Sequence, residues 1–255
     1  MTKVCVFVDG ENLRHTITEL YSPAFFDKRD YLPQAANWGA FFDNLVARAT
    51  DGNGKRVRTY WYVIDLVDSF PFVIKRANQT DQAVLDWQTE NEKILRKSNK
   101  WDAMQGAQNI QNLKNLHNVM WGDRETIKRR FDGFHVVQNK IANSHKAIEF
   151  RRSGSIGYNL LTKKLGQEKT VDANLSVDTV LLRDNYDMAL IVSGDQDYVP
   201  AVQAAKNYGK HVVNVAFEAQ NGALLPGGAK RLNNITDWSI AVSYADFKAA
   251  LGFPP

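Results

Sequence analysis

Short runs of apolar residues recur along the chain, and each is bounded by polar or helix-like sequence. Runs of about four to eight apolar residues with such boundaries are typical of strands that are buried on both faces of a parallel sheet. We expect these strands at residues 3 to 8, 57 to 64, 188 to 193 and 211 to 217, with a weaker one at 146 to 150. This repeated pattern favours an α/β fold.

Helix-like patterns lie between these runs, at residues 34 to 49, 172 to 184 and 199 to 208. Strands that alternate with helices indicate βαβ units and a mainly parallel, Rossmann-like sheet. Residues 80 to 140, approximately, break this rhythm because they are polar and helix-like. We therefore predict a single domain over residues 1 to 255 that carries a helical insertion.

The composition excludes several classes of protein. With 44% hydrophobic and 24% charged residues, the chain resembles neither a disordered nor a fibrous protein. The lone cysteine, Cys5, excludes a disulfide framework and a cysteine-based zinc site. The first residues read as a strand rather than a signal peptide, and no apolar run approaches the roughly 20 residues of a membrane helix. We expect a cytoplasmic protein without a membrane partner.

The charge is distributed unevenly along the chain. Residues 75 to 169 hold 18 Lys and Arg against 10 Asp and Glu, a net charge of +8, whereas the whole chain has +4 and the remainder therefore −4. This split suits a protein that keeps carboxylates in a pocket and presents a basic surface to a polyanion. A merely solvated basic helical face explains the charge equally well.

Acidic residues follow two of the predicted strands. Asp9 comes directly after the first strand, and Asp195 and Asp197 follow the strand that ends at Ser193. Asp172 begins the helix that leads into this second strand. Because the functional crevice of an open α/β sheet lies at the carboxyl ends of its strands, we expect these carboxylates to converge there.

Converging carboxylates repel one another unless a cation neutralises them, so the cluster predicts a hard divalent metal, Mg²⁺ or Mn²⁺. Such a metal can turn water into a nucleophile and stabilise charge on a phosphodiester, which is hydrolytic nuclease chemistry. Ser193 lacks a Gly-x-Ser-x-Gly context, so we expect it to hydrogen bond a phosphate or a metal-bound water instead of acting as a nucleophile.

Each acidic position also has a purely structural interpretation. Asp9 and Asp195 fit such an interpretation least well, because an acid directly after a buried strand needs a partner. The structural alternatives are a turn at Asp9-Gly10, a cap by Asn12 on a helix that begins near Leu13, N-caps at Asp172 and Asp197, and an exposed helix position for Asp178.

Four segments resemble the NYN domain family, a branch of the PIN-like nucleases. Two carry the strongest likeness, Val6-Phe7-Val8-Asp9-Gly10-Glu11-Asn12-Leu13 and Ile191-Val192-Ser193-Gly194-Asp195-Gln196-Asp197-Tyr198-Val199-Pro200. Lys169-Thr170-Val171-Asp172, with Asp178 after it, is similar to the family's Lys-Gly-Val-Asp segment. Gly209-Lys210-His211-Val212 is similar to its Gly-Lys turn. The resemblance covers residues 1 to 64 and about 145 to 240.

The resemblance implies a three-layer, PIN-like fold, a site for Mg²⁺ or Mn²⁺, and cleavage of RNA, most readily as an endonuclease. It assigns catalysis and metal binding to Asp9, Asp172 and Asp195, with Asp197 as a further metal ligand and Asn12, Asp178 and Ser193 as supporting residues. The chain departs from the family in having Thr170 where the family has glycine, and in its long insertion.

Basic residues near aromatic ones can hold single-stranded nucleic acid through phosphate contacts and base stacking. Our candidates for RNA binding are Lys128, Arg129, Arg130, Arg151 and Arg152. For Trp87, Trp101 and Trp121, packing within a small helical hairpin is the stronger interpretation. No histidine shows ligand spacing, and His15, four residues after Glu11, is the one closest to the predicted site.

Three functions follow from these patterns. The first is a metal-dependent ribonuclease acting on single-stranded or structured RNA. The second is a catalytically inactive RNA-binding or regulatory module of the same fold, suggested by the basic insertion and Thr170. The third is a phosphatase or phosphotransfer enzyme of the haloacid-dehalogenase type, a family that also places an aspartate after the first strand. We rank it last, because that family's motif resembles Asp-x-Asp, whereas here Asp9 is followed by Gly10 and Glu11. A homo-oligomer is compatible with all three.

Overall fold

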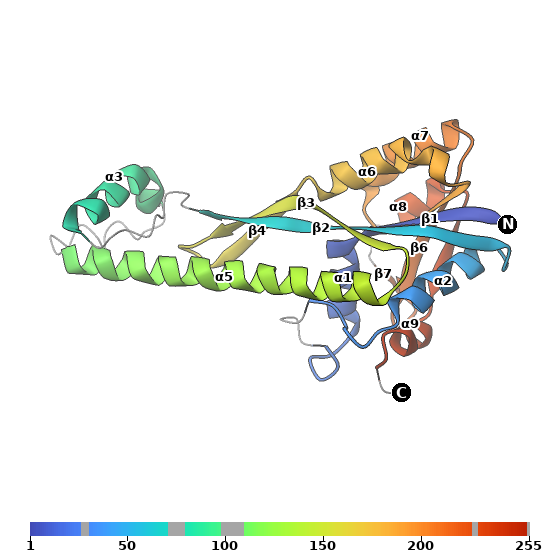
Figure 1. Cartoon of the computed structure of the whole chain (residues 1–255), viewed down its shortest axis with the longest axis horizontal. Coiled ribbons are helices and arrows are strands. Elements are labelled where there is room, and N and C mark those ends of the chain that lie inside the picture. The colour runs from blue at the N-terminus through green and yellow to red at the C-terminus, as the bar shows by residue number, and fades with distance from the viewer. Residues whose placement is uncertain (27–30, 71–79, 98–109, 226–228, 254–255) are drawn as a thin grey trace. The chain divides into compact units, whose positions relative to one another are not determined.

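The structure of the protein is a computed structural model that describes residues 1–26, 31–70, 80–97, 110–225 and 229–253 (Figure 1). The chain divides into two compact units. Unit 1 consists of Met1–Ile64, Phe134–Gly154 and Thr170–Pro255, and unit 2 of Asp65–Gly133 and Ser155–Lys169. Three elements, β2 (Gly54–Phe70), β3 (Ile148–Asn159) and α5 (Ile110–Ser144), contribute residues to both.

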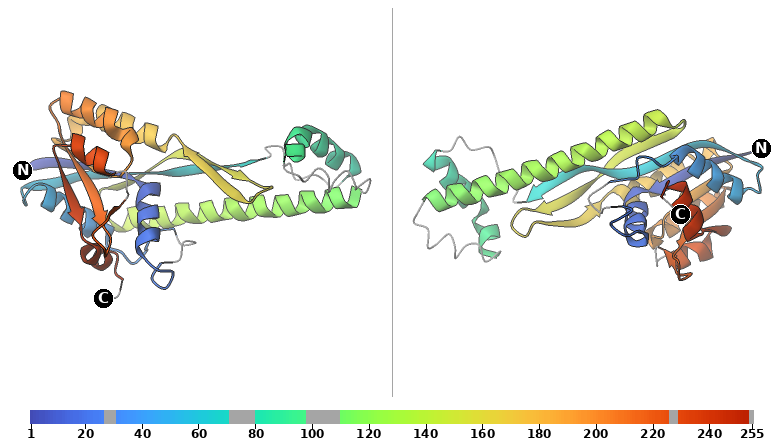
Figure 2. Two further views of the ribbon diagram at one scale, coloured as in Figure 1. Left: turned by 180° about the vertical axis from the view of Figure 1, so that it is seen from behind. Right: turned by 90° about the horizontal axis from the view of Figure 1, so that it is seen from below.

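Unit 1 is built on a mainly parallel sheet. Its central strands lie in the order β2, β1, β5, β6, and each neighbouring pair is parallel. The short strand β7 pairs antiparallel with β6. Strand β8 pairs parallel with β6, and the two lie side by side, in red and orange, in the left view of Figure 2. Besides β2, whose bounds are given above, the strands of this sheet are β1 (Thr2–Asp9), β5 (Met188–Val192), β6 (His211–Glu218), β7 (Leu224–Leu225) and β8 (Trp238–Val242).

The apolar runs form the strands because both faces of the central sheet are buried. Val4, Val6 and Val8 of β1 enter one core cluster. Cys5 and Phe7 alternate with them and point to the other face, where Phe7 contacts the rings of Tyr60 and Tyr186. All five residues of β5 are buried. A continuous apolar run is the expected sequence of such a strand.

Helices cover this sheet. Side chains of α1, α2 and α9 join the core cluster that contains Val4, Val6 and Val8. Helix α6 packs against β1 and lies beside α7 (Figure 1). The helical elements of unit 1 are α1 (Gly10–Leu20), α2 (Trp38–Ala49), α6 (Val171–Leu181), η1 (Arg183–Asn185), η2 (Gln196–Tyr198), α7 (Val199–Asn207), α8 (Ala229–Ile235) and α9 (Tyr244–Ala250).

Unit 2 combines a β-hairpin with helices. The outer half of β3 pairs antiparallel with β4 (Lys164–Lys169), and Ser155 lies opposite Lys169. Helix α3 (Asp81–Lys97) and the first part of α5 supply most of a small separate core. Its buried members are Val84, Trp87, Leu113, Met120 and Leu160.

These observations confirm the coarser prediction, a mixed α/β fold with a mostly parallel sheet. The three-layer, PIN-like arrangement and the single domain with an insertion stay predictions. Among the described residues, no helix has both the length and the apolar character that crossing a membrane requires.

Candidate metal centre

The parallel pairing of β1 and β5 places the ends of both strands at one edge of the sheet. Val8 lies opposite Val192, so Asp9 and Ser193 emerge side by side although 184 positions separate them in sequence. The hydroxyl of Ser193 donates a hydrogen bond to Oδ2 of Asp9 at 3.0 Å. As predicted from the strand ends, residues from the two halves of the chain meet here.

Asp9 is the most enclosed acid of this region, with only 3% of its surface exposed. Its Oδ1 accepts the backbone N–H of Asn12 at 3.0 Å, which makes Asp9 the N-cap of α1. Burial raises the pKa of Asp9 to about 7, and the nearby charge of Asp172 adds to the increase. Hydrogen bonds from Asn12, Ser193 and Tyr198 lower this pKa and offset part of the rise.

Three other acids form a compact group. Asp172, Asp195 and Asp197 each have an atom able to bind a metal, and these atoms lie within 4.8 Å of one another. Asp172 lies in the first turn of α6, whereas Asp195 caps η2 by accepting the backbone N–H of Asp197 at 2.9 Å. The pKa of Asp172 is raised, first by burial and then by the charges of Asp195 and Asp197.

The donor set of this group fits a hard divalent cation. Carboxylate oxygens are the ligands that Mg²⁺, Mn²⁺ and Ca²⁺ prefer, and the mutual repulsion that raises the pKa of Asp172 is what a cation would relieve. Asp9 is outside the group of three acids and is connected to it through Tyr198. The structure therefore separates the predicted ligands into three clustered acids and one buried acid behind them.

Tyr198 makes this connection, and the sequence analysis did not single it out. The side chain is fully buried, and its hydroxyl lies 2.7 Å from Oδ1 of Asp172 and 3.1 Å from Oδ2 of Asp9. A phenol has one proton, so it can donate to only one of the two carboxylates at a time. A proton on Asp9 satisfies the second contact, in agreement with the raised pKa of Asp9. In the sequence, Tyr198 is marked only by its place directly after Asp195-Gln196-Asp197.

Asn12 and Ser193 join the loops around the acids. The side-chain oxygen of Asn12 accepts the backbone N–H of Gly194 at 3.3 Å. Ser193 accepts the backbone N–H of Asp195 at 3.0 Å while donating to Asp9. The alternative in which Asn12 caps a helix near Leu13 is wrong, because α1 begins at Gly10 and Asp9 is its cap.

The capping alternatives for two other acids are also wrong. The N-cap of α7 is Tyr198 and not Asp197. The N-cap of α6 is Thr170 and not Asp172. Thr170 has φ of 76°, a left-handed conformation that glycine adopts more easily, and it stands where the NYN pattern has glycine. Its hydroxyl donates to the carbonyl of Ser153 at 2.8 Å, which helps to hold this conformation.

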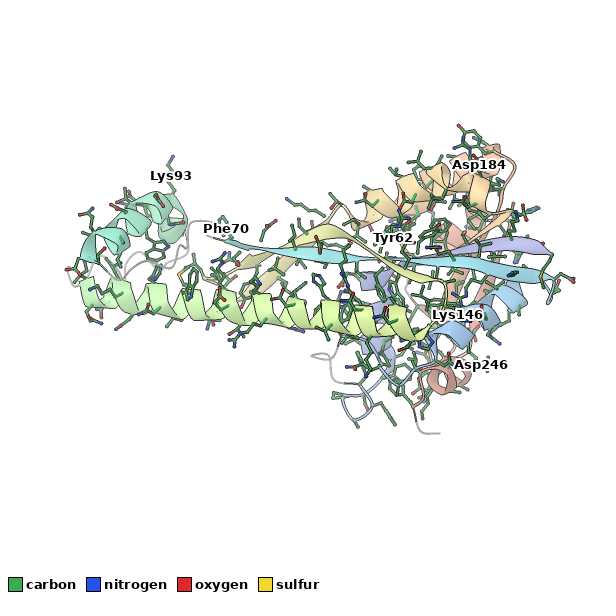
Figure 3. The ribbon with its side chains drawn as sticks, in the orientation of Figure 1. Tyr62, Phe70, Lys93, Lys146, Asp184 and Asp246 are labelled. Carbon is green, nitrogen blue, oxygen red and sulfur yellow. The ribbon has the colours of Figure 1, made fainter. Side chains whose placement is uncertain are left out.

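Asp178 lies on α6 with Asp172 but has different partners. Its Oδ2 accepts the hydroxyl of Tyr62 at 2.8 Å and Nη1 of Arg151 at 3.0 Å. Figure 3 labels Tyr62 on β2. Asp178 is therefore neither a member of the three-acid group nor the exposed helix residue of the structural alternative.

The predicted RNA-binding residues divide between the two units. Lys128, Arg129 and Arg130 are exposed on α5 in unit 2, and Lys128 forms an ion pair with Asp132 at 2.8 Å. Arg151 and Arg152 belong to unit 1 and bond within the chain. Arg151 lies 4.7 Å above the ring of Tyr60. Their role in RNA binding stays a prediction.

Two of the three predicted tryptophans are part of the core of unit 2. Trp87 is buried, with its ring edge against His117 at 5.3 Å, and Trp121 packs on the same cluster. This agrees with the packing interpretation. Trp101 lies outside the described residues. His15, the histidine nearest to the predicted site in sequence, is exposed on α1.

Comparison with known proteins agrees with the motifs. The NYN domain family matches residues 3–226, which include both strand ends and all the acids above. No curated protein matches the chain. Among solved structures, a protein of unknown function from Vibrio parahaemolyticus is similar with 13% identity and a TM-score of 0.42, over 94% of this chain and 93% of that one. With this family match over nearly the whole sequence, the chain belongs to the NYN domain family.

Proposed function

We propose that the protein is a metal-dependent ribonuclease that hydrolyses RNA phosphodiester bonds at the acidic edge of unit 1. The observation that carries this proposal is the convergence of Asp172, Asp195 and Asp197, whose potential ligand atoms lie within 4.8 Å of one another. Membership of the NYN family, whose members act as nucleases, supports it. Endonucleolytic cleavage, a PIN-like layering and a cytoplasmic location are part of the same proposal.

Each acid has a distinct part in the proposal. Asp172, Asp195 and Asp197 would hold Mg²⁺ or Mn²⁺. A divalent cation bound by these oxygens lowers the pKa of water and stabilises negative charge on a phosphodiester. Asp9 fixes the hydroxyls of Ser193 and Tyr198, and its pKa of about 7 allows it to exchange a proton near neutral pH.

The loop residues keep the acids in place. Ser193 holds Asp9 and the backbone of Asp195 through one hydroxyl, and Tyr198 holds Asp172. Rigid hydrogen bonds of this kind orient ligands before the cation and the substrate arrive. Asp9, Ser193 and Tyr198 are buried, so the hydrogen bonds among them are stronger than they would be in bulk water.

The alternative is an RNA-binding or regulatory module that lacks catalysis. One observation favours it: Asp9 is buried, hydrogen bonded and outside the group of three acids, so the site has fewer clustered ligands than the motifs predicted. The haloacid-dehalogenase alternative is not proposed, because the chain belongs to the NYN family.

Incubation of labelled single-stranded RNA with the purified protein in Mg²⁺, Mn²⁺ or EDTA tests the proposal. We expect cleavage that requires metal and disappears in both Asp9→Asn and Asp195→Asn, while circular dichroism shows both variants folded. Equal cleavage by the variants would mean that the activity comes from another site or a contaminant. RNA binding without cleavage under every metal condition would favour the regulatory module.

A further inference from the structure

Unit 2 contains a groove that lies entirely within its own residues. The groove has a volume of about 560 Å³, within the range of sites that accept small ligands or parts of larger ones. It lies between the end of β2, the outer half of β3 and β4. Its lining residues are Asp68, Phe70, Ser155, Gly157, Tyr158, Asn159, Lys164, Leu165, Gly166, Gln167 and Lys169.

The lining combines the groups that hold single-stranded nucleic acid. Lys164 and Lys169 supply positive charge, and the half-buried rings of Phe70 and Tyr158 supply flat apolar surfaces. Asp68 is the only acid among the lining residues. Cations that contact phosphates, placed beside rings on which bases stack, are the general pattern of single-strand binding sites. The sequence of unit 2 agrees in sign, with 14 Lys and Arg against 11 Asp and Glu.

The aromatic side of the groove is held in position before any ligand binds. Tyr158 packs on the buried cluster of Val84, Trp87, Leu113, Met120 and Leu160, which fixes one side of its ring. The backbone N–H of Leu160 donates to the carbonyl of Phe70 at 2.8 Å and ties the ends of β3 and β2 together. A preformed site loses less conformational entropy when its ligand binds.

Two glycines keep the groove open. A Cβ atom added at Gly157 would meet nothing within 4 Å, and one added at Gly166 would meet only the carbonyl oxygen of Gly157 at 3.5 Å. Neither glycine has a positive φ, so each position tolerates a side chain without backbone strain. A large side chain at Gly157 therefore fills open space and does not disturb the packed core.

We propose that this groove binds a segment of single-stranded RNA, with bases against Phe70 and Tyr158 and phosphates near Lys164 and Lys169. The proposal rests on the proposed function, because it takes RNA as the substrate and adds a contact site separate from the acids. Double-stranded RNA is a poorer fit, since its bases are stacked inside the helix and cannot lie on protein rings. Lys164 has no ion-pair partner among the described residues, so its charge is available to a phosphate.

Binding of a fluorescein-labelled single-stranded RNA of about 12 nucleotides, measured by anisotropy in EDTA, tests the groove without cleavage. We expect Gly157→Leu to weaken binding at least tenfold and Lys164→Gln about threefold. Lys164→Gln should also lower the slope of log affinity against log salt by about 0.7. The matched control is Lys93→Gln, an exposed lysine on α3 outside the groove (Figure 3), which removes the same charge and should bind as the wild type.

Wild-type affinity in both groove variants would overturn the proposal and leave the groove to a protein partner. Equal weakening by Lys93→Gln would also overturn it, because binding would then depend on net charge alone. A duplex competitor as effective as the single strand would contradict the single-strand assignment. If Gly157→Leu does not fold, Lys164→Gln still decides the outcome. If the groove variants lose RNA binding but the wild type does not cleave RNA, the proposed function is refuted and the groove is not. If the wild type cleaves RNA but the groove variants bind RNA as tightly as it does, only the groove is refuted.

Discussion

The acidic edge of unit 1 and the β3–β4 groove of unit 2 hold polar groups in opposite ways. Asp9 is 3% exposed and is hydrogen bonded to Asn12, Ser193 and Tyr198, so it is fixed by groups of the chain itself. In the groove, Lys164 is exposed and lies beside glycines that leave open space. The first arrangement suits chemistry at one atom, and the second suits the grip of a long polyanion.

The largest effect should separate two acids on α6. Asp172→Asn removes one of the three clustered carboxylates, and we expect the cleavage rate to fall on the order of 1000-fold, because a cation contributes several kcal/mol to such a reaction. Asp178→Asn, on the same helix but paired with Tyr62 and Arg151, should cost less than tenfold. Single-turnover kinetics in Mn²⁺ measure both rates. Equal losses would mean that the two acids do not have the separate roles described here.

A buried acid and an exposed acid should contribute differently to the pH dependence of the free energy of unfolding. The pKa of Asp9 in the folded protein, about 7, is above its ordinary value of 3.8, so the folded state binds the proton more tightly. This stabilisation is present below about pH 4 and is lost as the pH rises through 7. A pKa shift of this size corresponds to a few kcal/mol. In EDTA, we therefore expect the free energy of unfolding, measured with urea, to fall by about that amount between pH 4 and pH 8.

Asp9→Asn should remove most of this fall, whereas Asp184→Asn, at an exposed position labelled in Figure 3, should leave it unchanged. The same pH dependence in Asp9→Asn and the wild type would show that Asp9 does not take up the proton.

Two buried tyrosines provide the next comparison. Tyr198→Phe removes the hydroxyl between Asp9 and Asp172, and loss of a group that orients a metal ligand typically costs about 10-fold to 100-fold in metal affinity. Tyr186→Phe removes a buried hydroxyl that donates to the backbone of Thr179, and it should not change Mn²⁺ affinity. Isothermal titration with Mn²⁺ compares them. Unchanged affinity in Tyr198→Phe would mean that this hydroxyl does not position Asp172.

The smallest effect concerns the basic residues. Lys128→Gln removes an exposed charge from unit 2, and the salt slope of RNA binding should fall by about 0.7. Arg151→Gln should change the slope less, because Arg151 is half-buried and pairs with both Glu149 and Asp178, whereas Lys128 is exposed and has a single exposed partner, Asp132. Anisotropy across a salt series gives both slopes. A larger change in Arg151→Gln would show that Arg151 leaves its ion pairs when RNA binds.

Burial explains which strands the sequence predicts well. The predicted strands at 3 to 8, 188 to 193 and 211 to 217 correspond within about one residue to β1, β5 and β6, which are almost wholly buried. The outer parts of β2 and β3 were missed because they lack a continuous apolar run. β4, with the sequence Lys-Leu-Gly-Gln-Glu-Lys, has five polar or glycine residues in six and no strand-like pattern.

The candidate site shows the same limit. A strand end can be located from sequence, so Asp9 and Asp195 were expected near one edge of the sheet. The division between three clustered acids and a buried fourth depends on side-chain distances that spacing does not determine. Tyr198 was missed for this reason, because its role exists only where Asp9 and Asp172 come within reach of one hydroxyl.

Mn²⁺ binding measured by electron paramagnetic resonance tests the central claim most directly, because it reports the cation without needing a substrate. The wild type should bind Mn²⁺, and Asp195→Asn should weaken this binding at least tenfold, while Asp184→Asn on the exposed turn η1 binds as the wild type does. Equal Mn²⁺ affinity in the wild type and Asp195→Asn would contradict the assignment of Asp172, Asp195 and Asp197 as the metal centre.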